Sequence, residues 1–406
     1  MIGTRLADTL ILASRLAAAG TRLTAGRLRR SSGLGGPALP TDVASLDPAT
    51  LTRLLAPRHP SVRVTNVRVV ATEAGTTDRA RLELASEGTP VETLPAHLFV
   101  KLAPRDTATR LFVTMMGLGA NEVRFYDELR DRVAVRTPRA HVAVADPLSG
   151  DFVLVLDDLA AAGCSFASAA EPCTLATAQA MMRTLAALHA PWWDAAVLTR
   201  RFEWMRAPAR HRSVPLERAI SALGMRRGVA RFPDLVPETL RAATALLRDE
   251  RARLEHAWSQ PPLTVLHGDA HVGNTFADGE TVGLVDWQVT QQGQGMRDVT
   301  YFLCNSLPTE LRRAHERDLI ALYLDTLARA GTSGLGANVA WEQYRLHSLY
   351  AWISAAFTAG LATLQRDAIV RTALGRAAHA VIDLDALAAL AALSRRASRS
   401  DRTEPW

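Results

Sequence analysis

The stretch HGDAHVGN, residues 267–274, followed by LVDW, residues 284–287, decides how the rest of this sequence is interpreted. It is the densest polar cluster in an otherwise apolar neighbourhood. Asp269 and Asp286 each follow a short apolar run, which predicts that both carboxylates project from rigid backbone into a shared cleft. A carboxylate in such a place is costly unless a metal ion or a cation is paired with it. The pattern therefore predicts a site for a cation.

The spacing within this stretch is typical of one kind of chemistry. Asn274 follows Asp269 by five residues, and Asp286 comes twelve residues later, after a strand and a turn. The protein-kinase catalytic loop H-R-D-x-x-x-x-N has the same spacing, and there the aspartate accepts the proton of the substrate hydroxyl while the asparagine binds Mg²⁺. In that comparison Asp286 takes the place of the DFG aspartate, which binds metal.

An alternative follows from the alternation of His267, Asp269 and His271, which also fits a run of ligands in a hydrolytic zinc site. No further histidine cluster is apparent in the sequence, and this alternative leaves the pairing of Asn274 with Asp286 unexplained. In the kinase interpretation both histidines are structural supports of the loop, and His267 is expected to hydrogen-bond to its backbone.

The first half of the chain has the pattern of consecutive antiparallel strands. Three apolar, β-branched runs occupy residues 62–72, 79–86 and 96–104, and the stretch HVAVADPLSGDFVLVLDDL, residues 141–159, predicts two more strands around a turn. Between them, residues 121–132 place apolar side chains three apart, which predicts one helix. We therefore expect a five-stranded antiparallel sheet with a single helix.

Beyond residue 158 the apolar period changes from two to that of long helices, except around the polar loops described first. The predicted fold class is α+β, with two lobes: an antiparallel sheet N-lobe and a mostly helical C-lobe. We predict an N-terminal helical extension and linker over residues 1–40, the N-lobe over 41–158, the C-lobe over 159–394 and a mobile tail over 395–406.

Composition indicates an ordinary globular protein and excludes fibrous or low-complexity classes, because 48% of residues are apolar and 22% are charged. The formal charge of +6 comes from 47 basic and 41 acidic residues scattered along the chain, so a nucleic-acid partner is not indicated. Of the basic residues, 46 are arginine and one, Lys101, is lysine. Either this lysine survived by chance, or its position does not accept arginine.

The N-terminal segment and the cysteines indicate the cellular compartment in which the protein is expected. Residues 1–30 carry six arginines and one aspartate, and their apolar run is too short for a secretory signal. This segment is expected to pack as an extra helix, with contact to an anionic membrane surface as the alternative. Three widely spaced cysteines without a CxxC pair predict free or buried thiols in a reducing, cytoplasmic setting.

Several short motifs in fixed order carry a resemblance to a known family. The pieces DFVLVLDDL, ALHAPWW, LHGDAHVGN, VDWQ and RDVTYFL occur in that order, and with the preceding strands they cover roughly residues 60–305. The chain resembles the aminoglycoside phosphotransferase and choline-kinase-like superfamily, and the ecdysteroid-kinase-like branch looks closest. The resemblance implies a protein-kinase-like fold that uses ATP and Mg²⁺ to phosphorylate a hydroxyl of a small molecule.

The resemblance also implies where ATP is held. Lys101, at the end of the third strand, is expected to reach the phosphates, because a flexible ammonium suits this position better than a planar guanidinium. Glu122 is expected to pair with it, and Glu128 on the same helix is the rival partner. The turn over the phosphates is Gly75-Thr76-Thr77, which lacks the G-x-G-x-x-G of protein kinases. Backbone groups of the crossover hold adenine, at Leu156, Asp157, Asp158 and Leu159.

The remaining roles complete the predicted site. Asp269 is expected to be the catalytic residue, and Asn274 and Asp286 are expected to bind Mg²⁺. Asp298, in the stretch MRDVTYFL, is expected to be buried and to hold the catalytic loop through backbone N–H groups. The side chains of Asp157 and Asp158 are expected to cap the next helix.

The acceptor is the least specified partner. Residues 200–255 contain thirteen arginines and seven acidic residues, which does not suit a polycationic aminoglycoside. A neutral, apolar or anionic hydroxyl compound fits better, and a few of the tryptophans beyond residue 190 are candidates for lining its pocket. A nucleotide-binding pseudokinase that senses a ligand or scaffolds a partner is the alternative function, although such a protein would not need to keep Asp269.

Overall fold

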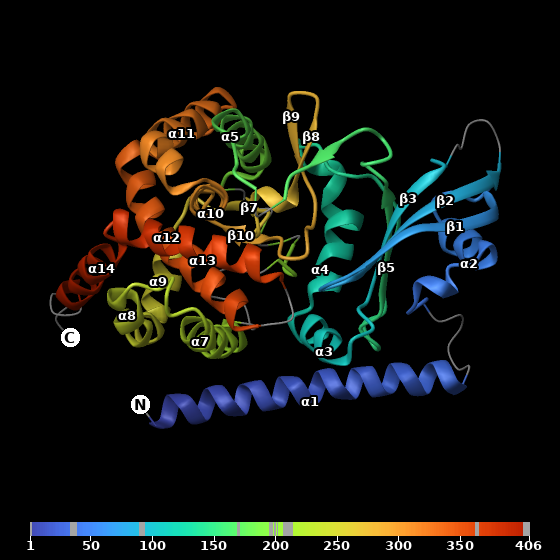
Figure 1. Cartoon of the computed structure of the whole chain (residues 1–406), viewed down its shortest axis with the longest axis horizontal. Helices are drawn as coiled ribbons and strands as arrows, with labels where there is room; N and C mark the ends of the chain where they lie inside the picture. The colour runs from blue at the N-terminus through green and yellow to red at the C-terminus, as the bar shows by residue number, and fades with distance from the viewer. Residues whose placement is uncertain are drawn as a thin grey trace. The chain divides into compact units, whose positions relative to one another are not determined.

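The apolar runs of the first half form one five-stranded antiparallel sheet in the computed structural model of the chain, shown in Figure 1. The structure describes residues 2–32, 39–88, 94–168, 171–194, 198, 200, 202–205, 214–361 and 365–400. Two compact units are present and are described separately. The sheet unit comprises residues 12–165 and 285–289, and the helical unit comprises residues 1–11, 166–284 and 290–406.

The strands of the sheet unit follow the order β1-β2-β3-β5-β4, and all neighbouring strands are antiparallel. Side chains alternate in β2, where Ala80, Leu82 and Leu84 are buried between partly exposed neighbours. The bounds of the strands are β1 (Arg63–Ala74), β2 (Asp78–Glu87), β3 (His97–Leu102), β4 (Ala140–Ala145) and β5 (Phe152–Asp157). The prediction of five antiparallel strands is confirmed.

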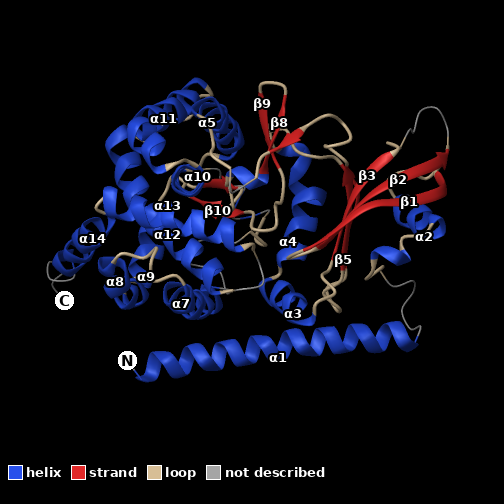
Figure 2. Cartoon of the chain, viewed as in Figure 1, coloured by secondary structure: helices blue, strands red, loops and turns tan. Residues whose placement is uncertain are grey.

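Helices cover this sheet more fully than the sequence analysis expects. The prediction of a single helix is wrong, because two short helices also form, α2 (Pro48–Leu55) and α3 (Thr107–Met116). The side chain of Asp47 caps α2 by accepting the N–H of Thr50, and Asp106 caps α3 in the same way. Leu51 on α2 joins the core under β2 and β3, and these strands are drawn with their helices in Figure 2.

The helix predicted over residues 121–132 is not one regular helix. It begins earlier, as α4 (Leu118–Arg124), and continues through a π-helical turn over Phe125–Leu129 and a 3₁₀ turn over Arg130–Arg132. Gly119 brings α4 close to β5, since a Cβ atom there would lie 2.2 Å from the ring of Phe152. The close approach places the buried Glu122 near the sheet.

The helical unit is built around α10 (Met296–Ser306), all eleven residues of which are buried. Two short strand pairs precede it: β7 (Thr264–Leu266) pairs with β10 (Gln291–Gly293), and β8 (Thr275–Asp278) pairs with β9 (Thr281–Leu284). The other helices are α5 (Leu175–His189), α7 (Val214–Arg231), α8 (Glu238–Asp249), α9 (Arg251–Trp258), α11 (Thr309–Arg329), α12 (Ala337–Gly360), α13 (Asp367–Asp383) and α14 (Ala386–Ser400). This helical part and the antiparallel sheet confirm the predicted fold class.

The two ends of the chain are helical in their described residues. At the N-terminal end, α1 spans Ile2–Ser32. The remaining strand of the described residues, β6 (Ser165–Phe166), lies in the middle of the chain between β5 and α5. The predicted tail, residues 395–406, overlaps the last turn of α14 as far as Ser400, and residues 401–406 lie outside the described part. Within the described residues no single helix has the length and apolar character of a membrane span, although α13 and α14 meet these criteria together as a bent pair.

Candidate active site

The loop after β7 holds the predicted catalytic aspartate. Gly268 has φ of +86°, a left-handed conformation that glycine adopts without strain, and it turns the chain out of the strand. The side-chain amide of Asn274 donates to the backbone oxygen of Asp269 at 3.0 Å and to its carboxylate Oδ2 at 3.1 Å. These bonds fix the amide nitrogen toward Asp269. The amide oxygen of Asn274 therefore points away, as a ligand of a hard cation must.

Asp298 fastens this loop from α10. Its carboxylate is fully buried and accepts the backbone N–H groups of His267 at 2.7 Å and Gly268 at 3.0 Å. Nε2 of His189 lies 3.4 Å from the same carboxylate, and Nδ1 of His189 lies 2.9 Å from the hydroxyl of Tyr323. Burial alone would raise the pKa of Asp298, but the hydrogen bonds with His189 and Gly268 lower it below its ordinary value. The carboxylate is thus a charged anchor for the loop backbone.

Both histidines of the loop bond to its backbone. Nδ1 of the buried His267 accepts the N–H of Asp269 at 3.3 Å, and Nδ1 of His271 accepts the N–H of Gly273 at 3.0 Å. His271 thereby caps the 3₁₀ turn Val272–Asn274. Among the described residues no group of three or more His, Cys, Asp or Glu side chains could hold a metal ion. The described residues therefore offer no ligand set for the zinc alternative.

Lys101 is the centre of a second cluster, in the sheet unit. Its Nζ lies 2.7 Å from Oε1 of Glu122 and 3.1 Å from Oδ1 of Asp286. Only 6% of the lysine side chain and none of the Glu122 side chain is exposed. Burial would lower the pKa of Lys101, but attraction by Asp286 and Glu122 outweighs burial and raises the pKa. The ammonium is therefore held charged, with Glu122 as its partner, whereas Glu128 is exposed on the surface.

The segment that carries Asp286 is anchored to α4 and its continuation. Trp287 is fully buried, stacks on Phe125 with ring centroids 3.9 Å apart, and donates from Nε1 to the hydroxyl of Thr137. The side chain of Asn121 donates to the backbone oxygen of Gln288 at 2.9 Å. Asp286 itself has φ of +67°, which is uncommon outside glycine and occurs at functional sites. The surrounding contacts hold its carboxylate in one direction.

The predicted nucleotide loops lie in the same unit. The turn between β1 and β2 is closed by the N–H of Gly75 donating to the backbone oxygen of Thr77 at 3.1 Å, and Thr77 is buried while Thr76 is partly exposed. At the end of β5, Leu156 and Leu159 are buried. Their roles toward phosphate and adenine stay predictions.

The expected helix caps are wrong for both crossover aspartates. Asp157 accepts the N–H of Arg139 at 3.0 Å and contacts Nε2 of His141 at 2.9 Å, so it ties β5 to β4. Asp158 accepts the N–H groups of Ala160 and Ala161, and it also accepts from the guanidinium of Arg81 at 2.7 Å. The residues after it form a turn and not a helix, since α5 begins only at Leu175.

Comparison with known proteins now decides the family. Residues 90–346, more than half of the chain, match the model of the phosphotransferase enzyme family. The chain belongs to this family. No curated protein matches it. The ecdysteroid-kinase-like branch stays a prediction.

Solved structures similar to this phosphotransferase include three small-molecule kinases. Macrolide 2'-phosphotransferase MphH from Brachybacterium faecium is 17% identical, with 79% of this chain and 98% of that one covered and a TM-score of 0.41. Aminoglycoside-3'-phosphotransferase of type VIII is 21% identical, with 73% and 96% covered and a TM-score of 0.39. Choline kinase from Cryptosporidium parvum Iowa II is 10% identical, with 81% and 92% covered and a TM-score of 0.46.

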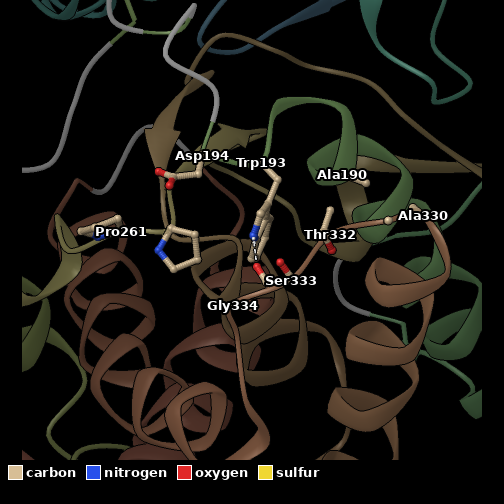
Figure 3. Close-up of a pocket in the computed structure, with 10 residues that line it drawn as sticks. Ala190, Trp193, Asp194, Pro261, Ala330, Thr332, Ser333 and Gly334 are labelled. Atoms are coloured by element: carbon tan, nitrogen blue, oxygen red, sulfur yellow. Dashed lines mark hydrogen bonds between the residues drawn. The ribbon is translucent and has the colours of Figure 1, made fainter.

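The helical unit also contains a cavity of about 560 Å³ away from the predicted residues. Figure 3 shows it between the turn at residues 190–194, the prolines Pro261 and Pro262, and the loop at residues 330–334. The indole of Trp193 donates to the backbone oxygen of Ser333 at 3.0 Å across this space. None of the residues assigned to the site from the sequence lines it.

Sequence reasoning missed Tyr301, an aromatic neighbour of the catalytic loop. Tyr301 on α10 lies 6.4 Å from His271 and 5.7 Å from Tyr350 of α12, measured between ring centroids. Burial raises the pKa of Tyr301 well above its usual value, and the nearby Asp269 carboxylate adds to this effect. The signal was present in RDVTYFL, where residues four apart share a helix face.

Proposed function

We propose that this family member transfers the γ-phosphate of Mg-ATP to a hydroxyl group of a small molecule. The observation that supports it best is the buried Lys101 ammonium between Glu122 and Asp286. A lysine held charged in this way is a point charge suited to phosphate oxygens. Burial of an ionised pair such as Lys101 and Glu122 costs free energy, and such costly charges are typical of functional sites.

The donor set fits Mg²⁺. This ion prefers a few carboxylate and carbonyl oxygens together with phosphate oxygens and water. Asp286 supplies a carboxylate on a fixed backbone, and Asn274 supplies an amide oxygen turned away from Asp269. We assign these two residues to the metal. Mg-ATP, when bound, supplies the phosphoryl group and the divalent charge that neutralises it.

Asp269 is assigned to the acceptor hydroxyl. About a quarter of its side chain, 27%, is exposed, and the side-chain amide of Asn274 holds its carboxylate in place. The acceptor oxygen forms a bond to the γ-phosphorus, the bond from that phosphorus to the oxygen of ADP breaks, and the hydroxyl proton passes to Asp269. Positioning by the loop supplies much of the rate in such a reaction.

The test is ADP release by purified protein with Mg-ATP and a library of small hydroxyl compounds. Wild type should turn over at least one compound, and Asp269→Asn should lower kcat by about 100-fold or more, as loss of a general base does. Asp318→Asn, which removes a carboxylate on the exposed side of α11, is the matched control and should keep full activity. Equal turnover by wild type and Asp269→Asn would end the proposed role of Asp269.

Calorimetry separates the proposal from its alternative. Wild type and Asp269→Asn should bind Mg-ATP with similar affinity, whereas Asp286→Ala should lose the dependence of binding on Mg²⁺. Binding of Mg-ATP without turnover of any compound would favour the nucleotide-binding pseudokinase. A folded wild type that binds no Mg-ATP would contradict both.

A further inference from the structure

Arg297, on the first turn of α10, is a buried cation without a carboxylate partner among the described residues. Only 9% of the residue is exposed, and its guanidinium carbon lies 3.7 Å from the ring centroid of Tyr350. The other arginine buried in the described part, Arg312, pairs with both Glu316 and Asp383. Contact with an aromatic ring offsets only part of the cost of burying a charge, so Arg297 lacks the partner that Arg312 has.

Three side chains that contact Tyr350 or one another, those of Arg297, Trp258 and His347, carry unpartnered polar atoms. Nε of Arg297, Nε1 of Trp258 and Nδ1 of His347 are buried and make no hydrogen bond within the described residues. The rings of Trp258 and His347 stack with centroids 5.6 Å apart, and the ring of Trp258 also meets that of Tyr350. Buried polar atoms are normally paired, so several orphans in one place indicate a missing partner.

The balance of these atoms favours a negative partner. The side-chain amide of Gln294 donates to two backbone oxygens, which leaves its Oε1 to accept from Nε2 of His347 at 2.8 Å. His347 is neutral, because burial and the charge of Arg297 keep its pKa well below the usual value. The cluster therefore offers the guanidinium and an indole N–H as donors, against one imidazole nitrogen as acceptor. An oxyanion matches this set.

Arg297 also has a defined relation to the catalytic loop. It precedes Tyr301 by four residues on α10, so both side chains lie on the same helix face, with a rise of about 6 Å between them. Tyr350 of α12 contacts both, and α10 and α12 lie side by side (Figure 1). Tyr301 in turn neighbours Asp269. Asp269 and Arg297 are thus both neighbours of the Tyr301–Tyr350 pair.

We propose that Arg297 binds an anionic group of the phosphate acceptor, so that the acceptor is a hydroxyl compound that also carries an oxyanion such as a carboxylate or a phosphate monoester. The proposal rests on the function proposed above, because it assumes that the hydroxyl is presented to Asp269. It separates this protein from kinases whose acceptors are cationic.

The first experiment tests the anion site without nucleotide, with inorganic sulfate as the probe. Melting temperatures are compared in sodium sulfate and in sodium chloride of equal ionic strength, because a ligand that binds only the native state stabilises it. Wild type should gain more from sulfate than Arg297→Met does. The control Arg366→Met removes an exposed arginine at the start of α13 and should respond like wild type. Arg297→Lys, which keeps the charge, should retain part of the response.

An equal response of wild type and the two Arg297 variants would overturn the proposal, whatever the outcome of the Mg-ATP calorimetry. If the calorimetry fails while the sulfate difference appears, the anion site stands and the proposed function falls. The two failures are thus distinguishable.

The second experiment tests the substrate class by ADP release. Each hydroxycarboxylic acid is paired with its amide, and each phosphate monoester of a diol is paired with the parent diol, which also tells the two oxyanions apart. Turnover should be confined to the charged members and should fall about ten-fold to a hundred-fold in Arg297→Met, as expected for loss of a charged hydrogen bond. Equal turnover of charged and uncharged members, or equal turnover of the charged ones by wild type and Arg297→Met, would overturn the proposal.

Discussion

Replacing Lys101 by methionine, alone and together with Glu122→Gln, should separate the effect of Lys101 on stability from its effect on Mg-ATP binding. The substitution keeps most of the side-chain volume and removes the ammonium that lies 2.7 Å from Glu122 and 3.1 Å from Asp286. The two carboxylates differ in their surroundings, since none of the Glu122 side chain but 20% of the Asp286 side chain is exposed. Water can solvate Asp286 in the variant, whereas Glu122 is left buried without its cation.

The expected loss of unfolding free energy follows from this difference in exposure between Glu122 and Asp286. Removal of one partner of a buried ion pair costs about 3–5 kcal/mol, because the other charge is left without compensation. Glu122→Gln should cost only about 1–2 kcal/mol, since Lys101 keeps Asp286 and the amide oxygen still accepts a hydrogen bond. Lys101→Met combined with Glu122→Gln removes the stranded charge. The double variant should therefore be more stable than Lys101→Met alone, by about 2 kcal/mol.

Urea unfolding followed by tryptophan fluorescence measures these three free energies, and calorimetry measures Mg-ATP binding in parallel. Both variants that lack Lys101 should lose Mg-ATP affinity, so the double variant should recover stability without recovering binding. If the double variant is as unstable as the sum of the single ones, Glu122 and Lys101 are not coupled and the reasoning fails. Normal Mg-ATP binding by the double variant would remove Lys101 from the nucleotide site.

Three further predictions concern the scaffold. Asp298→Asn should cost about 3 kcal/mol of unfolding free energy, because it weakens two charged hydrogen bonds to the loop. Folding lowers the pKa of Asp298, so its contribution to stability is complete above the unfolded carboxyl pKa of about 3.9. This contribution is lost as pH falls through the folded pKa. Acid unfolding of Asp298→Asn should therefore lack this loss of stability. Gly119→Ala should destabilise by about 1–3 kcal/mol through overlap with Phe152, and a melting temperature equal to that of wild type would contradict the close packing of α4. All three cysteines are buried, and burial raises the pKa of Cys173 to about 11 and that of Cys304 to about 12, so a thiol reagent at about pH 8 should label the native protein slowly and the unfolded protein at three sites.

The sequence predicts well where the cause is local. Alternating β-branched residues place β1, β2 and β3 to within a few residues, because the period of two is visible without any partner. The link between Asp269 and Asn274 joins residues five apart in one loop, so spacing alone suggests it. The short helices α2 and α3 were missed because eight and ten residues are too few to show a helical period.

Contacts between distant residues could not be predicted from spacing. Lys101 and Asp286 are separated by 185 positions, and the sequence analysis assigned Asp286 to a metal without expecting its ion pair with the lysine. The break of the helix after Arg124 coincides with the stacking of Phe125 on Trp287, a tertiary contact that local propensity does not contain. That Arg297 has no carboxylate partner within the described residues is likewise a property of its surroundings, which a sequence with 46 arginines does not reveal.

The burial of Lys101 has a consequence for how the protein can be marked and followed. Since the sequence contains no other lysine, the folded protein offers amine-reactive reagents and lysine-modifying enzymes no exposed lysine ε-amine. Acylation of the ε-amine would report opening of the sheet unit and nothing else. Lysine labelled with ¹³C at Cε would give a single NMR signal from inside the proposed nucleotide site, with no background from the surface.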